Sequence, residues 1–229
     1  MDEKISKSIL RHYSTLYRKY GDSPKSLGWG NGRQSMRFQI LNQIGDFQKC
    51  SVLDVGCGFG DFFKHLKSQK INSNYFGVDI NETFVKLAQK KYPKGKFQLR
   101  DIQKDKLDKK FDWVIGTGLT NKASTYSHLK NLLQEMFRIS KKGVAIDFIS
   151  NYVDYKEKNI FYTSPEIMLK FAKTLTRRVV LRHDYFPFEF CLYLYKNDKK
   201  NSKNVFSEYY EMQNPSIKKD SWKIKNSKK

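Results

Sequence analysis

The sequence predicts an α/β fold, with helices on both faces of a seven-stranded, mostly parallel sheet that ends in an antiparallel hairpin. Three features of its 229 residues predict this fold. β-rich runs alternate with helical patterns from residue 50 onward, a glycine-rich turn follows the first run, and the last two runs are separated only by a short turn around Pro187. This alternation favours right-handed βαβ crossovers, and the short final turn favours antiparallel pairing at the edge of the sheet.

The first 48 residues are predicted to form a helical cap. Apolar and aromatic side chains recur at spacings of three and four between residues 3 and 20, which is typical of an amphipathic helix. The stretch YGDSPKSLGWGNGRQ that follows is dense in Gly, Ser, Pro and Asn and indicates a loop. A second helix, at about residues 33–44, leads into the first strand.

Residues 49–196 are predicted to form the main domain. A late helix begins at Pro165, because Ser164 is a favoured N-cap residue and Glu166 stands in the first turn. The runs RVVLRHDY and FEFCLYLY after this helix form the predicted hairpin. The other strands are expected at residues 51–55, 75–79, 97–100, 111–116 and 143–149, and the other helices at 61–69, 82–91 and 124–140.

Residues 197–229 are predicted to be a basic tail. They lose the apolar periodicity and are rich in Lys, Asn and Ser, which favours partial disorder. The whole chain has a formal net charge of +21, and a basic surface attracts anionic partners such as RNA. The lysines are spread along the whole length, so a compositional bias explains the charge as well as an RNA-binding surface does.

The cysteines and the hydropathy pattern limit the class of protein. Cys50, Cys57 and Cys191 are odd in number and share no C-x-x-C spacing, so we expect neither a disulfide framework nor a metal site. No stretch approaches the roughly 18 uninterrupted apolar residues of a membrane span, and the N-terminus lacks an apolar signal core. We therefore expect a soluble, cytoplasmic protein without a membrane span.

The segment VLDVGCGFGD, residues 52–61, carries the clearest functional signal. A glycine-rich turn between a strand and a helix of a parallel sheet lies at the carboxyl edge, where ligands bind. A dinucleotide site requires G-x-G-x-x-G, but Asp61 occupies the position of the third glycine, and its charge would repel a pyrophosphate. A ligand that lacks phosphates and carries positive charge is compatible with both Asp54 and Asp61.

Three motifs together resemble the class I S-adenosylmethionine-dependent methyltransferases: VLDVGCGFGDF, then YFGVDI about twenty residues later, and LRDI after the next strand. The resemblance covers roughly residues 50–196 and includes the terminal antiparallel hairpin. It implies a Rossmann-like fold and an enzyme that transfers a methyl group. It also implies S-adenosylmethionine as cofactor, S-adenosylhomocysteine as product, and no metal.

The resemblance also implies roles for individual residues. Gly56, Gly58 and Gly60 would let the backbone approach the methionine moiety and the sulfonium. Asp54 would meet the amino group of the ligand, and Asp79 would accept both ribose hydroxyls. Asp54 and Asp101 have an alternative role, which is to hold a helix cap or a turn. The full set of implied cofactor contacts is Asp54, Gly56, Cys57, Gly58, Gly60, Asp79, Ile80, Asp101, Ile102, Gly116 and Thr117.

The expected acceptor is an O or N atom of a small molecule or glycan precursor. After the fourth strand the chain reads GTGLTNKAS, without the Asn-Pro-Pro-Tyr or Asp-Pro-Pro-Tyr motif of the family branches that methylate base nitrogens or glutamine amides. The single domain with a helical cap, and no appended RNA-binding module, favours a small acceptor. A tRNA or rRNA acceptor and a non-catalytic interaction module are the alternatives.

His183 is the candidate general base, because the segment RHDYFPFEF turns over at the active-site edge and histidine titrates near working pH. The alternative is that His183 only caps the hairpin. Trp29, between glycines in a loop, is the candidate lid residue. The residues expected to bind the acceptor are Tyr13, Tyr20, Trp29, Arg33, Arg37, Asn151, Asp184 and Tyr185.

Overall fold

The computed structural model describes residues 3–28, 33–122 and 125–197. The described residues up to Lys196 form one compact unit. Trp29 and nearly all of the predicted tail lie outside the described residues, so their predicted roles stay predictions.

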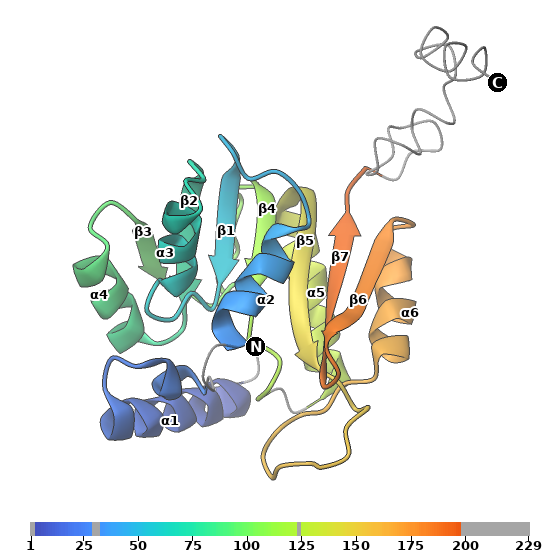
Figure 1. The fold of residues 1–229 in the computed structure, drawn as a ribbon, viewed down its shortest axis with the longest axis horizontal. Coiled ribbons are helices and arrows are strands. Elements are labelled where there is room, and N and C mark those ends of the chain that lie inside the picture. Colours follow the sequence, from blue (N-terminus) through green and yellow to red (C-terminus); the bar gives the residue numbers. More distant parts are fainter. Residues whose placement is uncertain (1–2, 29–32, 123–124, 198–229) are drawn as a thin grey trace, which may run out of the picture. The chain divides into compact units, whose positions relative to one another are not determined.

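The seven strands form one sheet in the order β3-β2-β1-β4-β5-β7-β6 (Figure 1). The first five strands in this order are parallel, and β7 is antiparallel to both β5 and β6. The predicted fold is therefore confirmed, including the terminal hairpin. The strands are β1 Ser51–Val55, β2 Asn74–Asp79, β3 Lys96–Leu99, β4 Phe111–Gly116, β5 Ser140–Ile149, β6 Val179–Phe186 and β7 Glu189–Tyr195.

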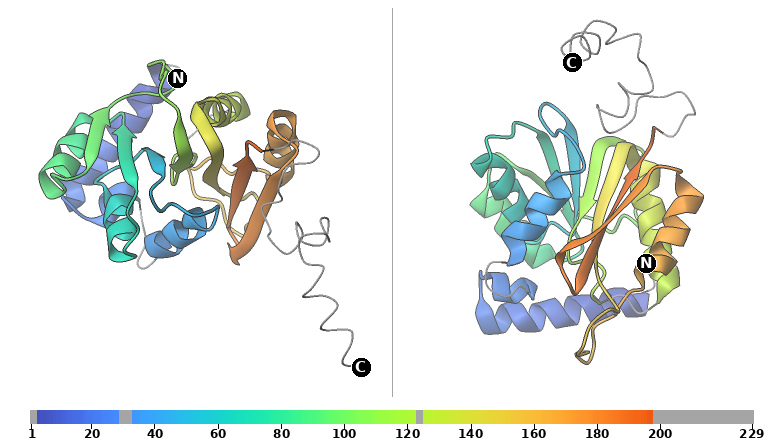
Figure 2. Two further views of the ribbon diagram at one scale, coloured as in Figure 1. Left: turned by 90° about the horizontal axis from the view of Figure 1, so that it is seen from above. Right: turned by 45° about the vertical axis from the view of Figure 1, so that its right-hand side comes forward.

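Five helices cover the two faces of the sheet (Figure 2, left). One core cluster joins the sheet to α2, α3 and α4, and a second joins it to α5 and α6. Side chains cap several of these helices; the Asn81 amide oxygen accepts from the N–H groups of Thr83 and Phe84 at the start of α4. The helices are α2 Arg33–Asn42, α3 Asp61–Ser68, α4 Glu82–Lys91, α5 Tyr126–Ile139 and α6 Pro165–Leu175.

The N-terminal helix α1 (Glu3–Tyr20) runs beneath the carboxyl edge of the sheet (Figures 1 and 2). Its apolar face packs against α4 and the glycine loop, where the Tyr17 ring lies 5.9 Å from the Phe59 ring and 6.0 Å from the Phe84 ring. A short 3-10 helix, η1 (Pro24–Leu27), follows where the sequence predicts only a loop. The apolar face that the sequence pattern predicts therefore packs α1 across the edge of the sheet where ligands bind in this fold.

Strand β5 is longer than the sequence predicts, because it begins at Ser140 directly after α5 ends at Ile139. Ser140 pairs with Phe111 of β4, while Lys141 and Lys142 lie exposed. Two consecutive charged residues obscure the start of a strand that is otherwise buried. The other predicted boundaries agree with the structure to within about two residues, a normal uncertainty at element ends.

Gly60 is needed for packing at the start of α3. Its φ is 80°, and a Cβ there would lie 2.9 Å from two Phe97 ring atoms and 3.0 Å from Tyr92. We expect Gly60→Ala to lower the free energy of unfolding by about 2 kcal/mol, because the left-handed backbone and the displaced rings both cost energy. Urea denaturation measures this loss.

Gly21→Ala is the matched control, because Gly21 also has a positive φ, 62°, but nothing lies within 4 Å of its added Cβ. It should show only the backbone cost of about 1 kcal/mol. Equal losses in the two variants would contradict a packing role for Gly60.

Candidate active site

One cavity opens at the carboxyl edge of the sheet, between the strand ends and α1. The ends of β1, β2, β3 and β4 contribute to it, and Ile9, Leu10 and Tyr13 of α1 line its other side. Most of the residues predicted to contact a cofactor line this cavity: Asp54, Gly56, Cys57, Gly58, Asp79, Ile80, Asp101, Ile102 and Thr117.

The glycine loop is held close to neighbouring segments by its lack of side chains. The N–H groups of Gly56 and Cys57 donate to the Val78 carbonyl at 2.7 and 3.0 Å, which ties the loop to β2. The φ of Gly56 is 69°, and a Cβ there would lie 2.1 Å from the Leu119 side chain. A side chain at Gly56 would therefore displace the Leu119 side chain and strain a backbone with positive φ.

Asp79 lies partly buried at the end of β2 and holds the glycine loop through its carboxylate. One oxygen accepts from the Gly58 N–H at 2.9 Å, and the other accepts from the Asn81 N–H at 2.8 Å. Burial raises the pKa of Asp79, and these backbone donors oppose the shift. Because a carboxylate has about four lone-pair positions, the group retains acceptor capacity for a ligand in the cavity.

Asp54 lies at the end of β1 and has a partner that the sequence does not indicate. Its carboxylate accepts a hydrogen bond of 2.6 Å from the Tyr75 hydroxyl. Burial raises the pKa of Asp54 to about 7, although the bond from Tyr75 favours the ionised form. Asp54 is therefore poised to change charge near neutral pH.

Two of the predicted cofactor contacts, Gly60 and Gly116, do not line the cavity. A Cβ at Gly116 would lie 2.5 Å from the Leu119 side chain, so packing explains this glycine as it explains Gly60. The sequence motif does not separate glycines that face a ligand from glycines that face neighbouring side chains.

The cavity also includes polar residues that the sequence did not single out. Asn81 and Arg100 line it, and the Nδ2 of Asn81 and the Nε of Arg100 are buried without a hydrogen-bond partner among the described residues. His128, in the first turn of α5, lines it as well, and burial lowers its pKa. The only sequence signal for Asn81 is its position two residues after Asp79. The orientation of its side chain depends on its role as the N-cap of α4, which the motif does not indicate.

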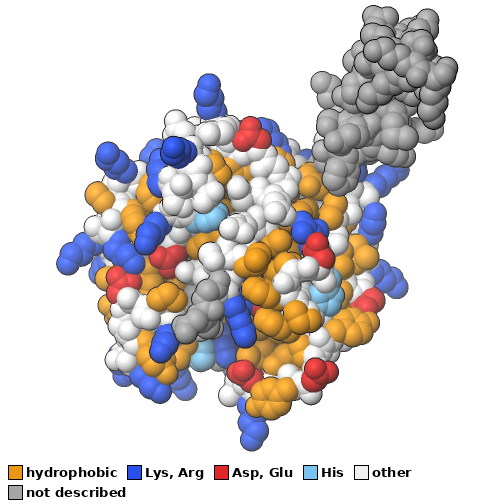
Figure 3. Space-filling model, viewed as in Figure 1, with side chains coloured by type: hydrophobic (Ala, Val, Ile, Leu, Met, Phe, Trp, Pro, Cys, Tyr) orange, Lys and Arg blue, Asp and Glu red, His pale blue; other side chains and the backbone are white. Residues whose placement is uncertain are grey.

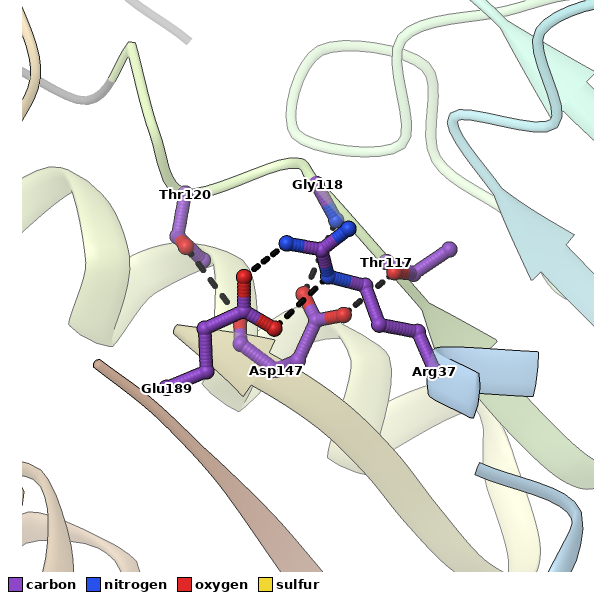
Figure 4. Close-up of polar contacts among 6 residues, drawn as sticks. All are labelled: Arg37, Thr117, Gly118, Thr120, Asp147 and Glu189. Atoms are coloured by element: carbon purple, nitrogen blue, oxygen red, sulfur yellow. Dashed lines mark hydrogen bonds and ion pairs between the residues drawn. The ribbon is translucent and has the colours of Figure 1, made fainter. Parts of the chain in front are cut away.

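A buried polar cluster lies beside the cavity at the ends of β4 and β5 (Figure 4). The Asp147 carboxylate accepts from the Thr117 hydroxyl and, at 2.8 Å, from the Gly118 N–H. Arg37 of α2 donates through two nitrogens to the carboxylate of Glu189, with a distance of 2.7 Å from Nε. Burial raises the pKa of Asp147, and Arg37 opposes this shift. The cluster joins four elements, and neither acid was predicted.

The predicted acceptor residues fall into different places. Tyr13 lines the cavity, and burial together with the carboxylates of Asp79 and Asp147 raises its pKa to about 12. Arg37 lies in the buried cluster, and the Arg33 guanidinium lies 4.8 Å from the centre of the Phe188 ring.

The hydroxyl of Tyr185 is buried and has no hydrogen-bond partner among the described residues. Burial raises its pKa, as does the nearby Asp147 carboxylate.

Like Arg33, Arg37 and Tyr185, the remaining described residues predicted to bind the acceptor lie outside the cavity lining. Tyr20 is at the exposed end of α1, Asn151 is exposed, and Asp184 pairs with Arg182 at 2.7 Å. The Nε2 of His183 lies 3.1 Å from the Pro187 carbonyl oxygen, within its own hairpin. This geometry favours the alternative role of His183, which is to cap the turn, and gives no support to a role as general base.

Within the described residues, no group of three or more His, Cys, Asp and Glu side chains is placed to hold a metal ion. No helix in this part of the chain is long and apolar enough to cross a membrane.

Comparison with known proteins identifies the family. Residues 52–143, which include the glycine loop and the ends of β1, β2 and β4, match the family model described as a methyltransferase domain. The chain belongs to the class I S-adenosylmethionine-dependent methyltransferases. S-adenosylmethionine is the methyl donor of this family, and this chain is an enzyme of the methyltransferase class.

Three comparisons describe the similarity. A Mycobacterium tuberculosis protein with a methyltransferase name is 23% identical over 167 residues, which are 69% of this chain and 98% of that protein. A malonyl-[acyl-carrier protein] O-methyltransferase of Hamiltonella defensa is 32% identical over 118 residues, which are 51% of this chain but only 43% of that enzyme. The magnesium protoporphyrin IX methyltransferase of Synechocystis PCC 6803, solved with bound S-adenosylhomocysteine, has a TM-score of 0.63 at 15% identity and covers 84% of this chain and 100% of its own.

Removal of the Glu189 charge should destabilise this methyltransferase, because the variant leaves the buried Arg37 guanidinium without its carboxylate. We expect Glu189→Gln to lower the free energy of unfolding by about 3 kcal/mol, measured by urea denaturation. Glu3→Gln is the control, since the Glu3–Lys7 pair is exposed, and it should leave the midpoint unchanged. A midpoint for Glu189→Gln equal to that of the control would contradict a stabilising role for the buried Arg37–Glu189 pair.

Proposed function

We propose that this methyltransferase transfers the methyl group of S-adenosylmethionine to an O or N atom of a small-molecule acceptor. The observation that carries the proposal is the cavity itself, in which the buried Asp54 and the partly buried Asp79 flank the glycine loop and α1 covers the opposite side. The RNA alternative differs in the acceptor only.

The residues present fit S-adenosylmethionine. Asp79 would accept the ribose hydroxyls, and Asp54 would pair with the amino group of the methionine moiety, as in the family motif. The buried donors on Asn81 and Arg100 lack partners among the described residues, and an adenosine moiety offers acceptor atoms for such groups. When bound, the cofactor supplies a methyl group activated by a sulfonium.

The chain's own part in the reaction is mainly alignment and the exclusion of water. Thr117, held by Asp147, would border the acceptor next to the glycine loop. Among the lining residues of α1, we place Tyr13 against the acceptor. The carboxylates of Asp79 and Asp147 both raise the pKa of its hydroxyl. α1 would shield the site from solvent.

A small acceptor fits this arrangement better than a polynucleotide, because α1 lies across the cavity. The name of one structural neighbour points the same way, since it acts on magnesium protoporphyrin IX. The name of one relative indicates a malonyl group carried by a protein, which is not a polynucleotide either. The net charge of +21 is the observation that favours RNA.

Transfer of labelled methyl from S-adenosylmethionine tests the two acceptor classes. The full chain is incubated with a panel of small carboxylates, phenols and amines, and separately with total tRNA and rRNA at low and moderate salt. We expect label in a small acceptor, with none in the Asp79→Ala variant. Label in RNA that falls steeply with salt would overturn the small-acceptor proposal.

Binding of S-adenosylhomocysteine should depend on pH through Asp54. The ligand's ammonium favours the ionised carboxylate, whose folded pKa of about 7 lies above its ordinary value of 3.8, so binding below pH 7 must release a proton. We expect affinity to be about tenfold weaker at pH 6 than at pH 8, measured by calorimetry.

Two variants check this dependence. Asp54→Asn should weaken binding and flatten the profile. Tyr75→Phe removes the hydrogen bond that favours ionised Asp54, so the profile should shift to higher pH. An unchanged profile in Asp54→Asn would assign the dependence to another group.

A further inference from the structure

We infer that the β6–β7 turn and the start of α2 form an acceptor subsite that takes a planar aromatic molecule carrying an anionic group. The inference rests on the proposed function, because it names the class of acceptor for the same active site. Three features of the described residues carry it: a pair of stacked rings, a guanidinium beside them, and a buried hydroxyl.

The rings of Phe186 and Phe188 form a flat apolar platform at the turn. Their centres lie 5.3 Å apart with an angle of 9° between their planes, and both side chains are only half-buried. Short hairpin turns usually carry polar residues and glycine, so two partly exposed phenylalanines on either side of Pro187 are unusual. Parallel rings with exposed surface are suited to contact with another planar ring.

Hydrophobic side chains gather around this turn and around the loop between β5 and α6, on the face drawn in Figure 3. The loop contributes Tyr152 and Tyr155, which are 59% and 74% exposed. Apolar surface concentrated beside a cavity commonly marks a place where a ligand binds. The platform is thus part of a larger apolar surface at the active-site edge.

Arg33 supplies the positive charge of the proposed subsite. Its guanidinium lies 4.8 Å from the centre of the Phe188 ring, and it has no carboxylate partner among the described residues. One turn further along α2, Arg37 is already paired with Glu189. An arginine that rests on an aromatic ring can still direct its N–H groups to a carboxylate or a phosphate.

Tyr185 links the platform to the reacting end of the site. Its buried hydroxyl has no hydrogen-bond partner within the described part of the chain. The nearby Asp147 carboxylate raises the pKa of this hydroxyl and accepts a hydrogen bond from Thr117 of the cavity lining. Gln34, adjacent to Arg33, also lines the cavity. The Tyr185 ring also packs against the platform, with its centre 5.4 Å from that of Phe186, so the proposed subsite places an acceptor on the Tyr185 side of the cavity.

Ligand-observed NMR on the full chain saturated with S-adenosylhomocysteine tests the inference with three probes. The probes are 2-naphthoate, its neutral analogue 2-naphthamide, and the non-aromatic anion cyclohexanecarboxylate. We expect 2-naphthoate to bind most tightly, because only this probe has both the planar ring and the charge. Absence of 2-naphthoate binding, or equal binding of all three probes, would overturn the inference.

Two variants separate the contributions of charge and ring. Arg33→Gln should weaken 2-naphthoate about tenfold and leave 2-naphthamide unchanged, whereas Phe188→Leu should weaken both aromatic probes. Arg11→Gln, on the exposed face of α1, is the matched control and should change neither. An Arg33→Gln protein that binds 2-naphthoate like the wild type would also overturn the inference.

Calorimetry with S-adenosylhomocysteine on the same proteins separates this inference from the proposed function. We expect unchanged cofactor affinity in all three variants, because none of the three residues lines the cavity. Normal cofactor binding without 2-naphthoate binding would reject the subsite alone. Absence of S-adenosylhomocysteine binding to the wild type would reject the proposed function.

Discussion

The buried carboxylate of Asp147 is the group on which the acceptor end of the site depends. It accepts hydrogen bonds from Thr117 and Gly118, and it thereby fixes the loop after β4 that borders the cavity. Arg37 acts on it electrostatically from α2 and is held in turn by Glu189 of β7. Buried charges are stable only when they are paired and hydrogen-bonded, so α2, the loop and the hairpin are constrained together.

The acids along the carboxyl edge have different partners, and this difference gives them different roles. Asp79 is held by backbone N–H groups, Asp54 by the Tyr75 hydroxyl, and Asp147 by Thr117 with Arg37 nearby. Burial raises the pKa of all three. A cationic ligand would relieve the cost of ionising Asp54, which has no cationic partner in its surroundings among the described residues. This is the physical reason that a sulfonium-bearing, ammonium-bearing donor suits the cavity.

Much of the fold and half of the site follow from local sequence patterns, and the rest depends on contacts between distant segments. The alternation of strands and helices predicts the sheet, and the motif around Asp54, Gly58 and Asp79 predicts the cofactor end, because these residues are close in sequence. Asp147 and Glu189 gain their roles only when β5 and β7 pair beside α2, which no local pattern indicates. His183 shows the limit of such patterns: its position in the hairpin suggests catalysis, but its Nε2 lies beside the Pro187 carbonyl of its own turn, so the general-base role stays a prediction.

Calorimetric titration of S-adenosylhomocysteine into the wild type and into Asp79→Asn is the most direct test of whether this cavity holds the cofactor. We expect micromolar-range binding to the wild type and a loss of at least about tenfold in the variant, because an amide cannot accept from both ribose hydroxyls while holding Gly58 and Asn81. Circular dichroism establishes that the variant is folded. No binding to the wild type, or equal binding to a folded variant, would show that the cofactor is not held by Asp79 in this cavity.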